Sequence, residues 1–241
     1  MSVPVPSFLG DGRNLYGVER IPQFVSRRSS AEVLVATEGM PPLRERVRRE
    51  MATGMLLAAE EVFAESGLAK AHVDDIARRA GVAVGTLYNY YGDRDALLAA
   101  VLGARVEELE VELQGVNRAH AASPVRRALL ELTRAYLRFF LRRRTFVRIL
   151  AEGELAQLKT AYPTSAAIPM QCWQSVRDAF GEVMDRGIRD GALRGAHADL
   201  DLWLFLGLLR GVVMRDLKGA TPCRESDADR VLQVFFEGAV S

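Results

Sequence analysis

Apolar residues recur at helical spacing along nearly the whole chain from Leu43 onward. Between Val47 and Phe63 they return every three or four positions, the period of an amphipathic helix. Ser66 and Gly67 then provide a stop, because glycine readily adopts the left-handed conformation that ends helices. No alternation of apolar and polar residues is long enough to indicate a β-sheet. The pattern therefore predicts an all-α fold.

A short helix, a glycine and a second short helix come next. The first is predicted over Val73–Ala80 and the second over Val84–Tyr90, with Gly81 breaking the chain between them. Small residues near the turn allow the two helices to cross closely at a steep angle, which is the geometry of a helix-turn-helix. Many helical corners with this spacing bind no DNA, so the spacing alone leaves the function open.

The remaining pattern is also helical. A long helix is expected from Asp93 to about Leu113, and a break from Tyr162 through Pro169. Further helices are predicted over Pro124–Leu141, Arg143 to about Lys159, Gln171–Arg189, Leu200–Lys218 and Asp227–Ala239. Residues 1–43 are rich in proline and glycine and are expected to form a flexible N-terminal extension, either a loosely held leader or an arm that reaches DNA or a partner.

Three stretches resemble a known family. They read LLAAEEVFAESG (56–67), VDDIARRAGV (73–82) and GTLYNYYGDRDALL (85–98). In order and spacing, residues 48–102 resemble the N-terminal domain of TetR-family transcriptional regulators. The resemblance implies a three-helix DNA-binding domain over 44–95 and a helical effector-binding and dimerisation domain over 96–241. It further implies a homodimer that binds a palindromic operator of double-stranded DNA. The resemblance also implies that the protein acts as a repressor and that a small-molecule effector releases it from the operator.

The second helix of the motif exposes an unusual group of neutral hydrogen-bonding side chains. Asparagine can pair with adenine, the threonine methyl can touch thymine, and hydroxyls can reach phosphates. Packing of the aromatic residues on the preceding helices is the alternative. With the resemblance, the expected DNA contacts are Gly85, Thr86, Tyr88, Asn89, Tyr90, Arg94 and Arg48.

Two positions depart from the family pattern. His72 stands where a capping Ser or Thr is usual, and Ala83 stands where the recognition helix often begins with Ser. A lost cap costs about 1 kcal/mol. Basic and acidic residues nearly balance over 44–95, so DNA affinity would depend on individually placed groups.

The effector half offers large adaptable side chains for a pocket. The candidates are Tyr136, Phe139, Phe140, Met170, Trp173 and Phe180. Each could instead be ordinary core, because packed interiors look the same in sequence. An arginine cluster between Arg138 and Arg148 could be a solvated face or could meet an anionic effector.

The stretch Leu202–Met214 is the most apolar of the chain, and Arg210 interrupts it. A helix that is apolar nearly all round must be buried on several sides, by its own domain and by a partner. The expected dimer interface is Leu202, Leu206, Leu209, Val213, Val231 and Phe235. A monomeric core is the alternative.

Composition narrows the function classes. Of 241 residues 49% are hydrophobic, and the formal charge is +1, so any DNA contact must come from local charge placement. Two cysteines and three histidines lack metal-ligand spacing, and neither a phosphate loop nor a nucleophile elbow is present. We therefore expect a non-enzymatic cytoplasmic protein with no metal, no cofactor and no membrane contact. The alternative function is a helical interaction protein that kept the fold and lost specific DNA binding.

Overall fold

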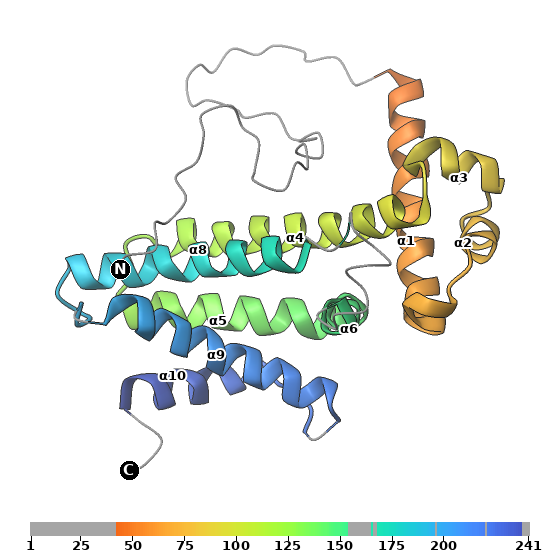
Figure 1. Ribbon diagram of the computed structural model, residues 1–241. Helices are drawn as coiled ribbons and strands as arrows, with labels where there is room; N and C mark the ends of the chain where they lie inside the picture. The colour runs from red at the N-terminus through yellow and green to blue at the C-terminus, as the bar shows by residue number, and fades with distance from the viewer. Residues whose placement is uncertain (1–41, 154–164, 166–167, 196, 220, 238–241) are drawn as a thin grey trace, which may run out of the picture. The chain divides into compact units, whose positions relative to one another are not determined.

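The computed structural model describes residues 42–153, 165, 168–195, 197–219 and 221–237 (Figure 1). These residues form helices and no strand, as the sequence predicted. The helices are α1 (Leu43–Lys70), α2 (Val73–Ala80), α3 (Val84–Tyr91), α4 (Arg94–Ala119), α5 (Val125–Arg142), α6 (Arg144–Gly153), α8 (Ile168–Arg189), α9 (Ala198–Leu217) and α10 (Asp227–Glu237).

The chain divides into two compact units, residues 1–47 and 48–241. The described part of the first unit is residues 42–47, where α1 begins. The expected N-terminal extension otherwise lies outside the described residues. The second unit contains both the helix-turn-helix and the helices that follow it, and the expected boundary between 95 and 96 stays a prediction.

Glycines shape the helix-turn-helix where the sequence placed them. Gly67 interrupts α1 with a φ of 73°, and Gly81 ends α2 in the left-handed conformation with a φ of 68°. The core between α2 and α3 consists of Ile76, Ala77 and Leu87, all almost fully buried. Because a side chain at Gly81 would be strained in this conformation, the turn favours glycine there.

The long helix α4 connects the motif to the rest of the second unit. Asp93 caps its start by accepting a hydrogen bond of 2.8 Å from the amide of Ala96. Near its other end, the buried Asn117 donates from Nδ2 to the carbonyl of Ala179 at 2.9 Å and to Glu182 at 3.0 Å. Helices α4, α5 and α8 run side by side (Figure 1), and α9 and α10 pack on α5.

Several boundaries differ from those expected. Helix α8 begins at Ile168, so Pro169 lies in its first turn and not in the break; proline fits there because first-turn amides have no helical partner. Pro124 occupies the N-cap position of α5, so the helix begins one residue later than expected. Helix α4 continues to Ala119, beyond the predicted end near Leu113. The expected ends of the α6 and α10 segments fall outside the described residues.

Candidate DNA-binding surface and effector cavity

One face of α3 is anchored and the other is open to solvent. Leu87 is 1% exposed and fastens the helix to α2. On the outer side Gly85 and Asn89 are exposed, Tyr88 is 44% exposed, and Thr86 is half-buried. A short helix with a buried leucine and neutral polar groups outside can present those groups to a groove.

The two tyrosines at the end of α3 have different roles. Tyr91 points inward and donates its hydroxyl to the carbonyl of Ala52 in α1 at 3.1 Å, and burial raises its pKa to about 12. Tyr90 is half-buried, and the guanidinium carbon of Arg48 lies 5.8 Å from its ring centroid. Arg48 and Tyr90, both expected DNA contacts, therefore form a cation–π pair between α1 and α3.

Arg94 is turned toward α1. Its Nη2 donates to the carbonyl of Leu68, and its guanidinium carbon lies 5.9 Å from the ring centroid of Phe63. The side chain is half-buried. A phosphate contact by Arg94, as expected from the sequence, would require it to leave these partners.

The charged groups around the motif are largely balanced. Arg79 makes two hydrogen bonds of 2.7 Å to Glu65, and Arg78 pairs with Asp75 at 2.8 Å. Neither His72 nor Ala83 caps its helix with a side chain, as their identities predicted. The geometry thus leaves shape and neutral polar groups as the main features of this surface.

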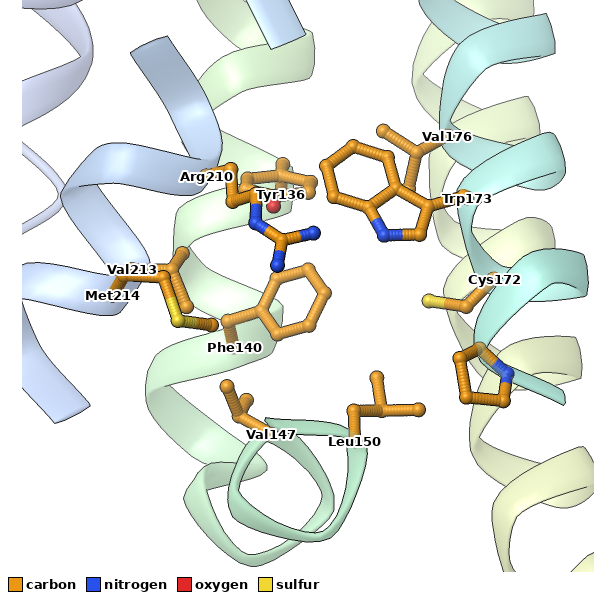
Figure 2. Close-up of a pocket in the computed structure, with 11 residues that line it drawn as sticks. Tyr136, Phe140, Val147, Leu150, Cys172, Trp173, Val176, Arg210, Val213 and Met214 are labelled. Carbon is orange, nitrogen blue, oxygen red and sulfur yellow. The ribbon is translucent and has the colours of Figure 1, made fainter. Parts of the chain in front are cut away.

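A cavity lies among α5, α6, α8 and α9 (Figure 2). Its empty volume is about 480 Å³, which includes the part open to solvent. Its described lining is mostly apolar: Tyr136, Phe140, Val147, Leu150, Pro169, Cys172, Trp173, Val176, Arg210, Val213 and Met214.

The sequence identified part of this lining. Tyr136, Phe140 and Trp173 line the cavity as expected. The other three candidates do not. Phe139 and Phe180 are fully buried in the surrounding core. Met170 is 61% exposed, because its position on α8 points outward.

Sequence reasoning missed Arg210 as a lining residue. It reaches the cavity from α9, and its guanidinium carbon lies 5.2 Å from the ring centroid of Trp173. The signal was present, since Arg210 is the charged residue that interrupts the apolar stretch Leu202–Met214.

The arginine cluster is a solvent-exposed face whose arginines pair with acids of other segments, and none of them is among the described residues that line the cavity. Arg138 pairs with Glu225 at 2.8 Å, Arg142 with Glu112 at 2.6 Å and Arg144 with Asp216 at 3.0 Å. Sequence neighbours could not reveal these pairs, because the acids come from α4, α9 and the segment before α10.

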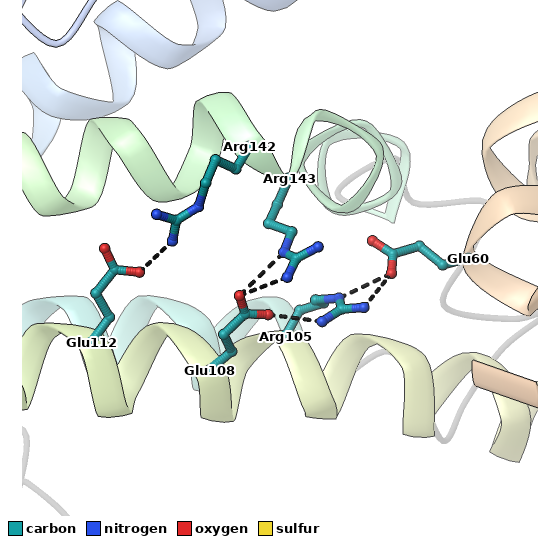
Figure 3. Close-up of polar contacts among 6 residues, drawn as sticks. All are labelled: Glu60, Arg105, Glu108, Glu112, Arg142 and Arg143. Carbon is teal, nitrogen blue, oxygen red and sulfur yellow. Dashed lines mark hydrogen bonds and ion pairs between the residues drawn. The ribbon is translucent and has the colours of Figure 1, made fainter. Parts of the chain in front are cut away.

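A connected set of ion pairs joins α1, α4 and the α5–α6 junction (Figure 3). Arg105 donates to Glu60 of α1 at 2.6 and 3.0 Å and to Glu108 at 2.8 Å. Arg143 donates to the other oxygen of Glu108 at 2.8 Å. We call Glu60, Arg105, Glu108 and Arg143 the interhelical network.

The interhelical network is partly shielded from water. The side chains of Arg105 and Glu60 are 14% and 12% exposed. Burial would raise the pKa of Glu108, but its hydrogen bonds from Arg143 and Arg105 outweigh this and hold that pKa below its ordinary value. Arg143 lies between Phe140 and Val147, two cavity residues, so the network ends beside the cavity wall.

Known proteins match the helix-turn-helix region of the chain in sequence and a longer part of it in fold. Residues 55–101, which cover the end of α1, both helices of the motif and the start of α4, match the model of bacterial regulatory proteins of the tetR family. Over these residues the chain resembles TetR-family regulators.

Curated HTH-type transcriptional regulators match parts of the chain that differ in length. An uncharacterized HTH-type transcriptional regulator, YvdT of Bacillus subtilis, is 47% identical over 47 residues, 20% of this chain and 24% of that protein. The activator FasR of Mycolicibacterium smegmatis is 29% identical over 151 residues, 63% of this chain and 65% of FasR. The repressor KstR of Rhodococcus jostii is 28% identical over 113 residues, 47% of this chain and 53% of KstR. Each match spans less than two thirds of the relative.

Solved structures resemble the fold over a longer range. FadR of Bacillus subtilis, solved in complex with stearoyl-CoA, has a TM-score of 0.66 at 17% identity, covering 78% of this chain and 99% of FadR. The TetR-family regulator PfmR of Thermus thermophilus has a TM-score of 0.64 at 19% identity, with coverages of 78% and 99%. At these identities the similarity concerns the fold.

The residues expected at the dimer interface lie at different depths in the fold. Leu206, Leu209, Val213 and Val231 are buried by the chain's own helices, and Leu202 and Phe235 are half-buried. The apolar surface of α9 that does face solvent comprises Leu200, Trp203 and Leu204 and continues past the exposed Gly207 and Gly211; we call it the α9 stripe. The sequence alone did not separate these two sets of residues, because a helix that is apolar all round does not reveal which side its own domain covers.

Over the described residues, no cluster of His, Cys, Asp and Glu could hold a metal ion. Within the same part of the chain, no helix combines the length and apolar character needed to cross a membrane.

Proposed function

We propose that this protein is a sequence-specific, DNA-binding transcriptional regulator of the repressor type. The observation that carries the proposal is the recognition helix α3, which holds Leu87 in the core and offers a dense group of neutral hydrogen-bonding side chains to solvent. The TetR-family match covers this helix. Residues 44–95 would bind DNA, and residues 96–241 would bind the effector and a second copy.

Each exposed group suits a particular DNA contact. The amide of Asn89 can pair with an adenine edge, and Thr86 can reach a base or a thymine methyl. Tyr88 and Tyr90 suit phosphates, and the Arg48 guanidinium on Tyr90 adds a positive charge beside that hydroxyl. Gly85, which has no side chain and open space around it, allows the backbone to approach the DNA closely.

The proposed active form is a homodimer on a palindromic operator. Two recognition helices must enter successive major grooves, about 34–36 Å apart. The α9 stripe supports a partner surface, because Trp203 and Leu204 are each more than half exposed, and its two glycines permit close helix approach. Trp203→Arg should therefore shift the protein from dimer to monomer in sedimentation experiments.

The effector is proposed to occupy the cavity. Its apolar lining fits a predominantly apolar small molecule, and FadR of Bacillus subtilis, which has a similar fold, was solved with stearoyl-CoA. An effector that displaced Phe140 or Val147 would also displace Arg143, which lies between them in the chain. The ion pairs of the interhelical network would pass this displacement to α4 and α1. Operator affinity would fall by the difference in effector binding between the two conformations.

The test is selection of genomic DNA fragments by the purified protein, followed by footprinting and a salt titration. Enrichment of one palindrome, with affinity falling as salt rises, is the expected result. No enrichment by a dimeric protein, both as purified and after refolding to remove any carried ligand, would contradict the proposal. That outcome would favour a helical interaction protein that kept the fold without specific DNA binding.

A further inference from the structure

Two polar side chains of the cavity wall stand apart from the apolar residues around them. Tyr136 of α5 and Cys172 of α8 both line the cavity and are only 4% and 5% exposed. Figure 2 shows the Cys172 sulfur directed into the cavity from α8. Within the part of the chain that the structure describes, neither the hydroxyl nor the thiol forms a hydrogen bond. Buried polar groups nearly always have a partner, so this pair calls for an explanation.

Both groups are uncharged hydrogen-bond donors. Burial raises the pKa of the Cys172 thiol to about 12, and burial together with the neighbouring Cys172 raises the pKa of Tyr136. Each group therefore keeps its proton at neutral pH and can donate it to an acceptor. The Tyr136 hydroxyl is the stronger donor, because a thiol donates only weakly.

Arg210, which carries the charge among the described lining residues, is already engaged within the protein. Its guanidinium carbon lies 5.2 Å from the ring centroid of Trp173, and the side chain makes a further interaction of its own. An anion would also lose its hydration on entering a cavity whose other described walls are apolar or neutral. The donor that awaits a partner here is the neutral Tyr136 hydroxyl, which suits an uncharged oxygen acceptor.

We propose that the effector is an uncharged, mainly apolar molecule with a carbonyl oxygen that accepts a hydrogen bond from the Tyr136 hydroxyl. Its apolar body packs on Phe140, Val147 and Leu150, which line the same cavity. Tyr136 is then the residue that selects for the oxygen. The inference rests on the proposed function, because it concerns the same effector site.

The probes are two sets of molecules of matched shape that differ in one group. Acetophenone and nonan-2-one carry the carbonyl, and α-methylstyrene and 2-methylnon-1-ene replace its oxygen by a methylene. Benzoate and octanoate instead replace the methyl group beside the carbonyl by a charged oxygen. One set has a ring and the other a linear chain as its apolar body, so the test does not depend on the shape of the natural effector.

Binding to the full-length protein is followed by NMR of the valine and leucine methyl groups. Val147, Leu150, Val176 and Val213 line the cavity, so shifts of their signals locate the probe as well as measure its affinity. Water solvates a ketone better than an alkene. The quantity compared is therefore the ratio of the two dissociation constants, in the unaltered protein and in the variant.

Tyr136→Phe removes the hydroxyl alone. In at least one set it should weaken binding of the ketone about three- to tenfold, the loss expected for one neutral hydrogen bond, and leave the alkene unchanged. Cys172→Ala should weaken the ketone less than Tyr136→Phe does, because a thiol is the weaker donor. In the unaltered protein the carboxylate should bind more weakly than its ketone, because a charge loses more hydration in the cavity.

The matched control is Tyr91→Phe. It also removes a tyrosine hydroxyl from a partly buried site, but that hydroxyl is bonded to the carbonyl of Ala52, outside the cavity lining. The ratio of ketone to alkene binding should stay unchanged. Circular dichroism establishes that each variant is folded.

Other outcomes overturn the inference. A folded Tyr136→Phe protein that binds ketone and alkene in the unaltered ratio would do so, as would a carboxylate that binds more tightly than its ketone. No shift of the cavity methyl signals by either ketone at its solubility limit would do the same. Operator selection is measured separately, so an enriched palindrome with failed probes rejects only the ligand class. Ketone binding as expected, without an enriched palindrome, keeps the ligand class and rejects the role in DNA binding.

Discussion

The recognition helix and the cavity differ in how far apart in the chain their essential neighbours lie. Leu87 of α3 belongs to the same buried core as Ile76 and Ala77, about ten residues earlier, and α2 and α3 are in contact. The cavity combines residues from Tyr136 to Met214, carried by four helices. A short-range structure can be encoded by local pattern and turn chemistry, whereas a cavity depends on how distant helices rotate against one another. Local sequence signals therefore predict the helix-turn-helix, whereas the lining of the cavity follows only from the packing of all four helices.

The largest expected effect is a loss of stability in the helix-turn-helix that leaves the cavity region folded. Leu87→Ala removes most of a fully buried side chain and should lower the free energy of unfolding of the motif by about 2–5 kcal/mol. DNA binding should be lost, while the helices that line the cavity stay folded. Thermal unfolding followed by circular dichroism and an operator-binding titration measure the two effects. Loss of most of the helical signal at once would show that the cavity depends on the motif's core.

A smaller effect concerns the surface of α3 alone. Asn89→Ala should relax the preference at one base pair of the operator by about 1–3 kcal/mol and leave folding unchanged, because Asn89 is exposed. Competition binding with single-base operator variants measures this. Equal weakening on every sequence would make Asn89 a contact that positions the protein and does not read a base.

A change in the interhelical network tests whether the two regions are linked. Glu60→Gln leaves Arg105 with one carboxylate partner and should cost about 1–2 kcal/mol of stability. It should also reduce the effect of a cavity ligand on operator affinity, measured by repeating the DNA titration with and without the ligand. Glu107→Gln, an exposed glutamate of α4, is the control. An unaltered ligand effect in Glu60→Gln would assign the coupling to other contacts.

The smallest expected effect is a gain in the stability of the helix-turn-helix. His72 occupies the N-cap position of α2 without capping it, so His72→Ser should stabilise the motif by about 1 kcal/mol or less. Cavity binding should not change. Chemical denaturation compares this variant with His72→Ala, which adds no acceptor and should not stabilise. A similar gain in both variants would mean that removal of the histidine, and not the cap, is responsible.

These regions also mark the limit of prediction from the sequence. Helix α2 was predicted at its observed bounds, because acidic residues at its start and Gly81 at its end are local signals. In the cavity, Phe140 was identified correctly and its neighbour Phe139 was not. Adjacent residues point about 100° apart on a helix, so only the packing of other helices decides which one faces a cavity. Arg210 was missed for the same reason.

The anchor at Asn117 gives α4 the mechanics of a lever. Arg105 lies about 18 Å along the helix axis from this anchor, and Arg94 about 35 Å. If α4 swings as a rigid rod about the anchor, a shift of about 1 Å at Arg105 becomes about 2 Å at Arg94. A small displacement in the middle of α4 is therefore nearly doubled at the end of the helix that adjoins α3.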